Sequence, residues 1–195
     1  MTTRRKIIAY LATSADGYIA RPDGNVDWLD RPRIAGDYGN RAFLRSIDTI
    51  LWGRKTYDFA LQHGGLAMFG SKVKNYVFST QPPQEQPSDA TFVTQKVAEF
   101  IRRLRTQRGK NIWMMGGAGI IGSFLDAGGI DEFIIHVIPI LIGDGIPLGV
   151  RKNRNVALKL KSVRKYADGV VRLHYIVGRK VGNRTEQPQT TFLGG

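Results

Sequence analysis

Hydrophobic and polar positions along this chain change their spacing several times, and each change marks the expected boundary of a strand or helix. Runs rich in β-branched and aromatic residues predict strands over residues 6–12, 49–52, 74–79, 90–93, 112–115, 132–138, 156–166 and 170–177. Apolar residues three or four positions apart predict helices over residues 37–46, 55–62, 97–104 and 120–127. Residues 14–30 are rich in Gly and Asp and are expected to form a loop.

The order of these elements predicts an α/β fold in three layers. Strands alternate with helices, which favours a mostly parallel central sheet, and the last two strands flank an Asp168-Gly169 turn typical of an antiparallel C-terminal hairpin. Right-handed crossovers then place ligands at the carboxyl ends of the parallel strands. We expect one domain over residues 1–180, followed by a polar, flexible tail over residues 181–195.

Composition narrows the class of protein. With 42% hydrophobic residues the chain can bury a core, whereas its apolar runs are far shorter than the roughly 20 residues of a membrane span. The sequence has no cysteine, and its three histidines lack the spacing of zinc ligands, so we expect no metal site. The absence of cysteine also fits a cytoplasmic protein.

The formal net charge of +13 favours an anionic partner, which can be a phosphorylated cofactor, a phosphorylated substrate or a nucleic acid. The basic residues are scattered, with clusters over residues 102–110, 151–154 and 159–165. No helix-turn-helix, zinc-finger or aromatic RNA-binding motif accompanies them. We therefore interpret the clusters as solvated faces rather than as a nucleic-acid footprint.

Two glycine-rich segments lie where an expected strand passes into an expected helix. They are Gly53-Arg54-Lys55-Thr56 and Gly116-Gly117-Ala118-Gly119. Backbone N–H groups at a helix start bind anions, and glycine lets a phosphate approach the backbone. Each segment is equally compatible with an ordinary structural turn. Together with Ser79-Thr80 at the end of a third strand, they suggest one dinucleotide lying across several strand ends.

Candidate acids and bases are few. Asp27 and Asp37 lie near the early loop, and Asp37 is also suited to cap the helix that follows it. His136 is flanked by Ile135 and Val137, so it is either a ligand-facing residue or a buried histidine of the sheet.

Several segments, in order over residues 6–180, resemble the dihydrofolate reductase superfamily, and in particular the riboflavin-biosynthesis reductase (RibD C-terminal) domain. The segments are SADGYIA (14–20), GRKTY (53–57), KNYVFSTQP (74–82), IWMMGGAGIIGSFL (112–125) and HYI (174–176). The resemblance implies a dihydrofolate reductase-like fold and NADPH as cofactor. It places the cofactor on Ile19, Ala20, Gly53, Arg54, Lys55, Thr56, Ser79, Thr80, Gly116, Gly117, Ala118, Gly119 and Ile120.

The same resemblance implies roles on the substrate side. Asp37 falls where dihydrofolate reductases have the acid that binds the heterocycle and assists protonation, and burial is expected to raise its pKa. Asp27 is the second candidate for this catalytic role. Trp28, Arg41 and His136 are expected to contact the substrate.

The chain also departs from the superfamily pattern. Val73 stands where dihydrofolate reductases have the arginine for the folate carboxylate, and no zinc deaminase segment is present. We therefore expect a stand-alone NADPH-dependent reductase of a pyrimidine- or pterin-like small molecule, phosphorylated or not, similar to 5-amino-6-(5-phosphoribosylamino)uracil reductase. The alternatives are dihydrofolate reductase itself and a non-catalytic nucleotide- or nucleic-acid-binding module. The resemblance also suggests a homodimer, with the apolar residues 133–142 either at its interface or in the core.

Overall fold

A computed structural model gives the fold over residues 4–31, 36–70, 72–85, 87–149 and 155–178. The predicted tail over residues 181–195 and the basic cluster over residues 151–154 lie outside this part of the chain.

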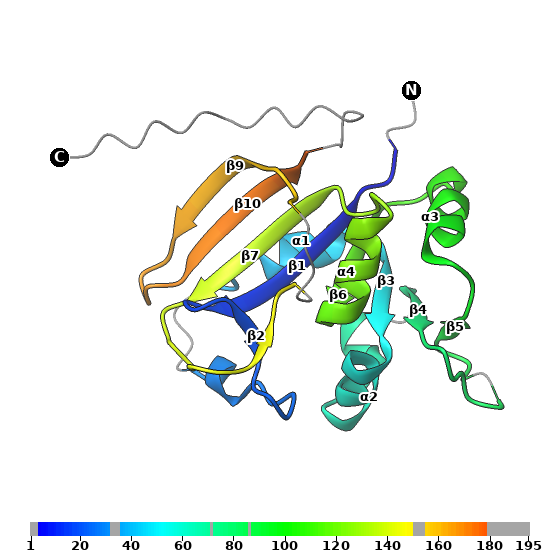
Figure 1. Cartoon of the computed structure of the whole chain (residues 1–195), viewed down its shortest axis with the longest axis horizontal. Coiled ribbons are helices and arrows are strands. Elements are labelled where there is room, and N and C mark those ends of the chain that lie inside the picture. The colour runs from blue at the N-terminus through cyan, green and yellow to red at the C-terminus, as the bar shows by residue number, and fades with distance from the viewer. Residues whose placement is uncertain (1–3, 32–35, 71, 86, 150–154, 179–195) are drawn as a thin grey trace.

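The described residues form a central twisted sheet with the strand order β5-β4-β3-β6-β1-β7-β10-β9 (Figure 1). Its strands are β1 (Ile7–Ser14), β3 (Ile47–Gly53), β4 (Lys74–Phe78), β5 (Thr91–Val93), β6 (Asn111–Gly116), β7 (Glu132–Ile138), β9 (Leu158–Lys165) and β10 (Val171–Val177). The strands from β5 to β7 are parallel, and β10 runs antiparallel to both β7 and β9. The predicted mostly parallel α/β sheet with an antiparallel C-terminal hairpin is confirmed.

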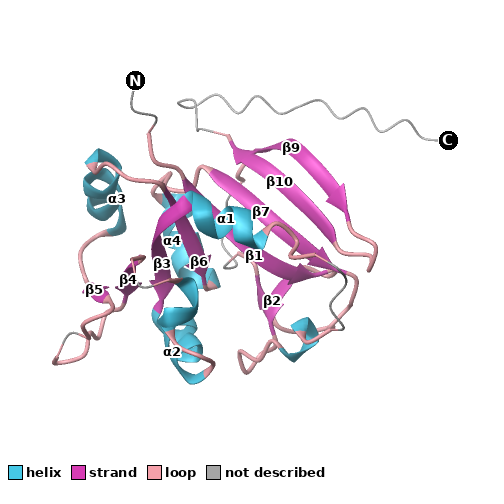
Figure 2. Cartoon of the chain, turned by 180° about the vertical axis from the view of Figure 1, so that it is seen from behind, coloured by secondary structure: helices cyan, strands magenta, loops and turns pink. Residues whose placement is uncertain are grey.

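Four α-helices cover the two faces of the sheet among the described residues: α1 (Asn40–Ser46), α2 (Arg54–Gln62), α3 (Val97–Thr106) and α4 (Ala118–Asp126). Helices α3 and α4 lie in front of the sheet in Figure 1, and α1 is seen in front in the reverse view of Figure 2. The remaining short elements are β2 (Tyr18–Ala20), β8 (Ile146–Pro147), and single 3₁₀ turns at Asp27–Leu29 and Leu66–Phe69.

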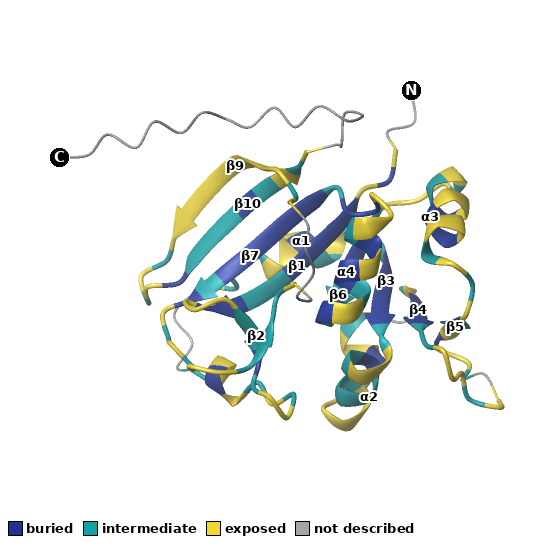
Figure 3. Ribbon diagram, viewed as in Figure 1, coloured by how far each residue is buried: buried dark blue, intermediate teal, exposed yellow. Residues whose placement is uncertain are grey.

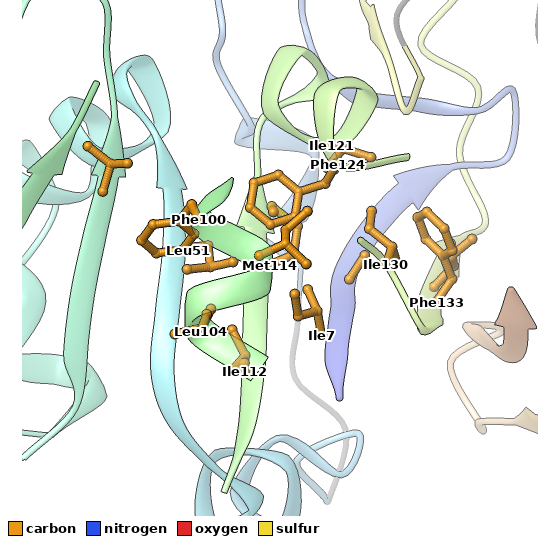
Figure 4. Close-up of a cluster of buried hydrophobic side chains, with 14 residues drawn as sticks. Ile7, Leu51, Phe100, Leu104, Ile112, Met114, Ile121, Phe124, Ile130 and Phe133 are labelled. Carbon is orange, nitrogen blue, oxygen red and sulfur yellow. The ribbon is translucent and has the colours of Figure 1, made fainter. Parts of the chain in front are cut away.

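Each face of the sheet has its own hydrophobic core. Phe100 of α3 and Phe124 of α4 pack on Leu51 and Met114 in the first cluster (Figure 4). A second cluster on the other face contains Phe43 of α1 and Tyr57 of α2, packed against strands β1, β3, β4, β6 and β7. Side chains alternate between the faces of a strand, so the nearly continuous apolar strands of the sequence supply both cores.

Strand β7 lies inside the sheet, between β1 and β10. Phe133, Ile134 and Ile135 are buried in the chain's own cores, so this part of residues 133–142 is a core strand. Whether the rest of the segment contributes to a dimer stays a prediction. The edge strand on this side is β9, whose residues are all exposed (Figure 3).

Strand β1 loses its neighbour β6 partway along its length. It pairs with β6 from Ile7 to Ala9, whereas it pairs with β7 as far as Ser14. Beyond Ala9 the two parallel strands therefore separate, and the sheet opens toward its carboxyl end. The helix that follows β3 lies on one face of the sheet, and the helix that follows β6 lies on the other. A ligand crevice is expected outside the strand ends at such a point.

Candidate functional site

A cleft of about 1570 Å³ lies at the carboxyl ends of the parallel strands. It extends from β2, through Ile19 and Ala20, across the opening between β1 and β6, to helix α2 and the ends of β4 and β5. Pockets for one small ligand usually measure roughly 300–1,000 Å³. This cleft therefore has room for two ligands side by side.

Two helices begin at the cleft, directly after neighbouring strands. Gly53 ends β3 and precedes α2, and Gly117 follows β6 and precedes α4. Neither glycine can cap its helix with a side chain, so the first N–H groups of both helices lack a side-chain acceptor. Two helix N-termini that open into one cleft form a site for an anion such as a diphosphate.

The two turns touch each other closely, so a side chain at either glycine would be tightly packed. A Cβ atom on Gly53 would lie 3.1 Å from the backbone nitrogen of Gly117, and one on Gly117 would lie 3.2 Å from Oγ1 of Thr56. Gly119, in contrast, faces open space, and a Cβ added there would meet no atom within 4 Å. Contact between the two turns explains why glycine occurs at positions 53 and 117. No such contact exists at Gly119, where the open space can admit a ligand.

The structure places most of the sequence-predicted cofactor residues around this cleft. The lining residues among them are Ile19, Ala20, Gly53, Arg54, Lys55, Thr56, Ser79, Thr80, Gly117, Ala118, Gly119 and Ile120. Gly116 does not line the cleft; it is buried, and its φ of 116° requires glycine. The structure therefore brings the twelve lining residues together around one cleft. Their contact with a cofactor stays a prediction.

Two polar side chains of this half are already engaged with the chain. The Ser79 hydroxyl donates to the Gln81 carbonyl (2.9 Å) and accepts from its N–H (3.1 Å), as in a local turn. The Arg54 guanidinium pairs with Asp58 (2.8 Å) one helical turn later and lies over the Phe92 ring. Thr94 and Gln95, which follow β5, also line the cleft, and no local motif marks either residue.

The other half of the cleft has an aromatic floor. The ring of Tyr10 on β1 stacks on Phe43 of α1, with their centroids 4.0 Å apart. Trp113 on β6 meets both rings edge-on and donates its indole N–H to the Tyr10 carbonyl (2.8 Å). The Tyr10 hydroxyl donates to the side-chain oxygen of Asn40. Flat aromatic surfaces with a few polar groups are suited to a planar heterocycle.

His136 lies at the edge of this floor, 5.0 Å from Tyr10 between ring centroids. It is buried, and its Nε2 lies 3.3 Å from the Tyr38 carbonyl oxygen. Burial lowers the pKa of His136, so the neutral imidazole is the favoured form near neutral pH. His136 is therefore a buried histidine of the sheet that also lines the cleft, and its contact with a substrate stays a prediction.

The two predicted catalytic acids do not line the cleft. The carboxylate of Asp37 accepts hydrogen bonds from the backbone N–H groups of Arg41 (2.8 Å) and Gly39 (3.0 Å), which lower its pKa. The expectation that burial raises this pKa is wrong, because the carboxylate is exposed and bound to backbone donors. Asp27 pairs with Arg21 (2.6 Å), which lowers the pKa of Asp27 as well.

Trp28 and Arg41 also lie outside the lining of the cleft. Trp28 is buried against Ile138 and Val170, where it closes a small core beneath the early loop. Arg41 is on the exposed face of α1, with 85% of its side chain accessible. Tyr10, Asn40, Phe43 and Trp113, which form the floor instead, were not predicted as site residues, since their proximity depends on strand pairing and on the docking of α1.

Within the part of the chain that the structure describes, no group of three or more acidic or histidine side chains is placed to hold a metal ion. In the same residues, every helix is too short or too polar to cross a lipid bilayer.

The sheet order and the cleft define a dihydrofolate reductase-like α/β protein. The dihydrofolate reductase from Enterococcus faecalis, solved with NADP(H), has the same fold with a TM-score of 0.58, at 15% identity and over 89% of this chain and 97% of that one. This chain belongs to the RibD C-terminal domain family, which it matches over residues 5–172.

Two further proteins are similar over nearly their whole length. YwjB of Bacillus subtilis (strain 168), a protein described as uncharacterized, is 38% identical over 88% of this chain and 98% of its own. A putative riboflavin biosynthesis protein from Shewanella sp. PV-4 has a TM-score of 0.77 and 28% identity, over 89% of this chain and 99% of that one. The suspected family and the dihydrofolate reductase-like fold are both confirmed.

Proposed function

We propose that this protein is an NADPH-dependent reductase of a pyrimidine- or pterin-like heterocycle, with 5-amino-6-(5-phosphoribosylamino)uracil or a related compound as the leading substrate. The observation that carries the proposal is one cleft with two adjoining halves. One half holds the starts of α2 and α4, and the other half has the aromatic floor of Tyr10, Phe43 and Trp113.

The residues of the first half fit a dinucleotide. Uncapped N–H groups at Gly53–Thr56 and Gly117–Ile120 are suited to the diphosphate, and Arg54 and Lys55 add positive charge beside them. The open space at Gly119 admits a ligand against the backbone of α4. Thr80, Thr94 and Gln95 lie at the far end, where polar groups are needed by the adenosine portion. When bound, the cofactor supplies a hydride.

The chain's own contribution is to position the second ligand and to exclude water from it. Hydride transfer requires the two reacting carbons in van der Waals contact. Ala20 of β2 and Trp113 of the floor both line the cleft. A planar ring held there lies next to the first half, so the geometry provides contact between two bound ligands.

Dihydrofolate is a less favoured substrate. Val73, at the position of the folate-binding arginine, is an apolar residue packed against the second core cluster. The nucleic-acid alternative is also less favoured, because cations of the predicted basic cluster on α3 have partners within the chain. Arg105 pairs with Asp131 (3.2 Å), and Arg103 lies over the Phe100 ring.

Cofactor titration tests the proposal. We expect saturable NADPH binding at micromolar concentrations, followed by protein fluorescence, and weaker binding of NADH. Gly119→Val places a side chain in the open space of the cleft, so it should weaken NADPH binding at least roughly tenfold without unfolding the protein. The matched control is Gly149→Val, since Gly149 also faces open space and does not line the cleft.

Failure of the folded wild type to bind NADPH would overturn the reductase proposal. Equal binding by both glycine variants would show that the cofactor lies elsewhere. Turnover of the ribosylaminopyrimidine and of dihydrofolate, each with NADPH, then decides between the two substrates. The homodimer and the cytoplasmic localisation stay predictions.

A further inference from the structure

The 3₁₀ turn at Leu66–Phe69, between α2 and β4, brings apolar side chains to the cleft. Glycines with left-handed φ values stand on both sides of it, Gly65 at 69° and Gly70 at 102°. Side chains rarely adopt this conformation, so both ends of the turn depend on glycine.

The side chains of the turn have two different environments. Residues three apart lie on the same side of a 3₁₀ turn. Leu66 is buried in the second core cluster, and the Phe69 ring lies 5.5 Å from the Trp113 ring of the floor, between centroids. Met68, between them, lines the cleft and is 60% exposed.

Met68 belongs to a larger surface of the cleft. Phe59 and His63 of the preceding segment also line the cleft, with their rings stacked 4.0 Å apart. The Met68 methyl group lies close to them, since a Cβ atom added at Gly64 would be 3.9 Å from it. We call Phe59, His63, Met68 and Phe69 the collar. Because Phe69 contacts Trp113, the collar continues the aromatic floor.

The collar has no side chain that pairs with a charged ligand group. Residues 59–69 include no Lys, Arg, Asp or Glu. The charged residues that line the cleft lie outside this segment, and they are Asp23, Arg31, Arg54, Lys55 and Asp58. A charged group placed on the collar would therefore lose hydration without gaining a partner. An uncharged aromatic group would instead bury the exposed Met68 thioether and pack on the neighbouring rings.

We propose that the collar binds an uncharged aryl substituent on the ring that lies over the floor. The inference rests on the reductase function proposed above and adds a class of ligand whose substituent differs from that of the leading substrate. The phosphate of the leading substrate needs cations, which the collar lacks, so the two kinds of substituent use different parts of the cleft.

Three probes test this proposal: pterin, 6-phenylpterin and 7-phenylpterin. They share one ring and differ in the presence and position of the phenyl group. Their affinities are measured by calorimetry on the full chain saturated with NADP⁺, at a pH where the three compounds are neutral. We expect wild type to bind at least one phenyl compound about tenfold more tightly than pterin, the effect of removing roughly 60 Å² of apolar surface from water.

Variants assign this gain in affinity to the collar. Met68→Gln keeps the length of the side chain and makes its end polar, so it should reduce the gain several-fold while the affinities for pterin and NADP⁺ stay near wild type. Met68→Leu should keep the gain. Leu61→Gln is the matched control, because Leu61 is an exposed apolar residue of α2 that does not line the cleft.

The outcomes separate this inference from the proposed function. If pterin binds and neither phenyl compound binds more tightly, or if Met68→Gln leaves the gain intact, the aryl site is overturned and the reductase proposal is not. If no pterin binds a wild type that binds NADP⁺, the heterocycle class and this inference both fail. Loss of the gain in Met68→Gln, with retention in Met68→Leu and Leu61→Gln, supports the inference.

Two further measurements exclude other occupants of the collar. Weaker NADP⁺ binding by Met68→Gln would assign the collar to the cofactor. A changed elution volume of Met68→Gln in gel filtration would assign it to a contact between copies of this chain. Either result overturns the aryl site.

Discussion

The backbone around Asp37 explains why its side chain serves structure rather than the cleft. Tyr38 and Gly39 have φ values of 53° and 89°, in the left-handed region, so the chain turns sharply just before α1. The Asp37 carboxylate accepts the N–H of Gly39, within this turn, and the N–H of Arg41, just after it. A side chain that stabilises a helix start in this way is ionised, and each of its two oxygens is held by a backbone donor.

Replacing Asp37 separates the structural role from the catalytic one. Asp37→Ala should lower the midpoint of thermal unfolding, since two backbone donors at the start of α1 lose their acceptor. Turnover should stay within about tenfold of wild type, whereas loss of a general acid costs roughly 10²- to 10⁴-fold. Steady-state kinetics on the folded variant provides the measurement. A loss of the larger size would restore Asp37 as the proton donor.

At the scale of the elements, locally encoded features could be predicted and those that depend on distant partners could not. The strand-to-helix passages at Gly53 and Gly117 were found because the glycine and the change of period lie within a few residues. Helix α1 was expected from residue 37 and begins at Asn40, because a helix cannot include the left-handed Tyr38 and Gly39. Strands β2 and β8 were missed, since such short strands exist only through their pairing with each other.

The aromatic floor was missed for the same physical reason. Tyr10 and Asn40 are 30 positions apart, and Tyr10 and Trp113 are 103 apart. Each residue is unremarkable in its own segment, as an aromatic residue in a strand or a polar residue near a helix start. Only the parallel pairing of β1 with β6 and the docking of α1 bring them together.

An ionic cluster around the buried Glu132 joins strands β7, β9 and β10, and the residue just before β1, at the other end of the sheet. Glu132 of β7 accepts from Lys6 (2.6 Å), lies 2.7 Å from His174 of β10, and is 3.7 Å from Lys161 of β9. Burial alone would raise the pKa of Glu132, but the hydrogen bonds from Lys6 and His174, together with Lys161, lower it overall. The cluster therefore favours the ionised carboxylate and holds β7 to the terminal hairpin.

The sign of this shift fixes the pH dependence of stability. A carboxyl group with a lowered pKa in the folded state stabilises the fold above its unfolded pKa of roughly 4.3, and this contribution is lost as the pH falls through the lowered value. Glu132→Gln should cost about 2 kcal/mol in the free energy of unfolding near neutral pH, and less in acid. Urea unfolding across a pH series measures it, with the exposed Glu99→Gln as control. A pH-independent loss would contradict the assignment.

At the scale of the whole molecule, the net charge of +13 acts on every anionic ligand that approaches the cleft. NADPH and NADH differ by one phosphate, so the pair isolates the effect of charge. Raising NaCl from about 0.05 M to about 0.5 M should weaken NADPH binding more than NADH binding, because salt screens the attraction of the cations for the added phosphate. Fluorescence titration at several salt concentrations follows both. Equal salt dependence would show that the 2′-phosphate lies outside the field of the basic surface.

The contact between the turns at Gly53 and Gly117 has a consequence for protein engineering. Each turn occupies the volume that a side chain on the other would need, and Thr56 fills the space between them. A designer who transplants this edge onto another scaffold must therefore move both segments together and preserve the spacing of β3 and β6. Libraries that randomise only one of the two turns should be enriched in small residues at its contact position. Position 119 should be more permissive, because a Cβ atom there meets no atom within 4 Å.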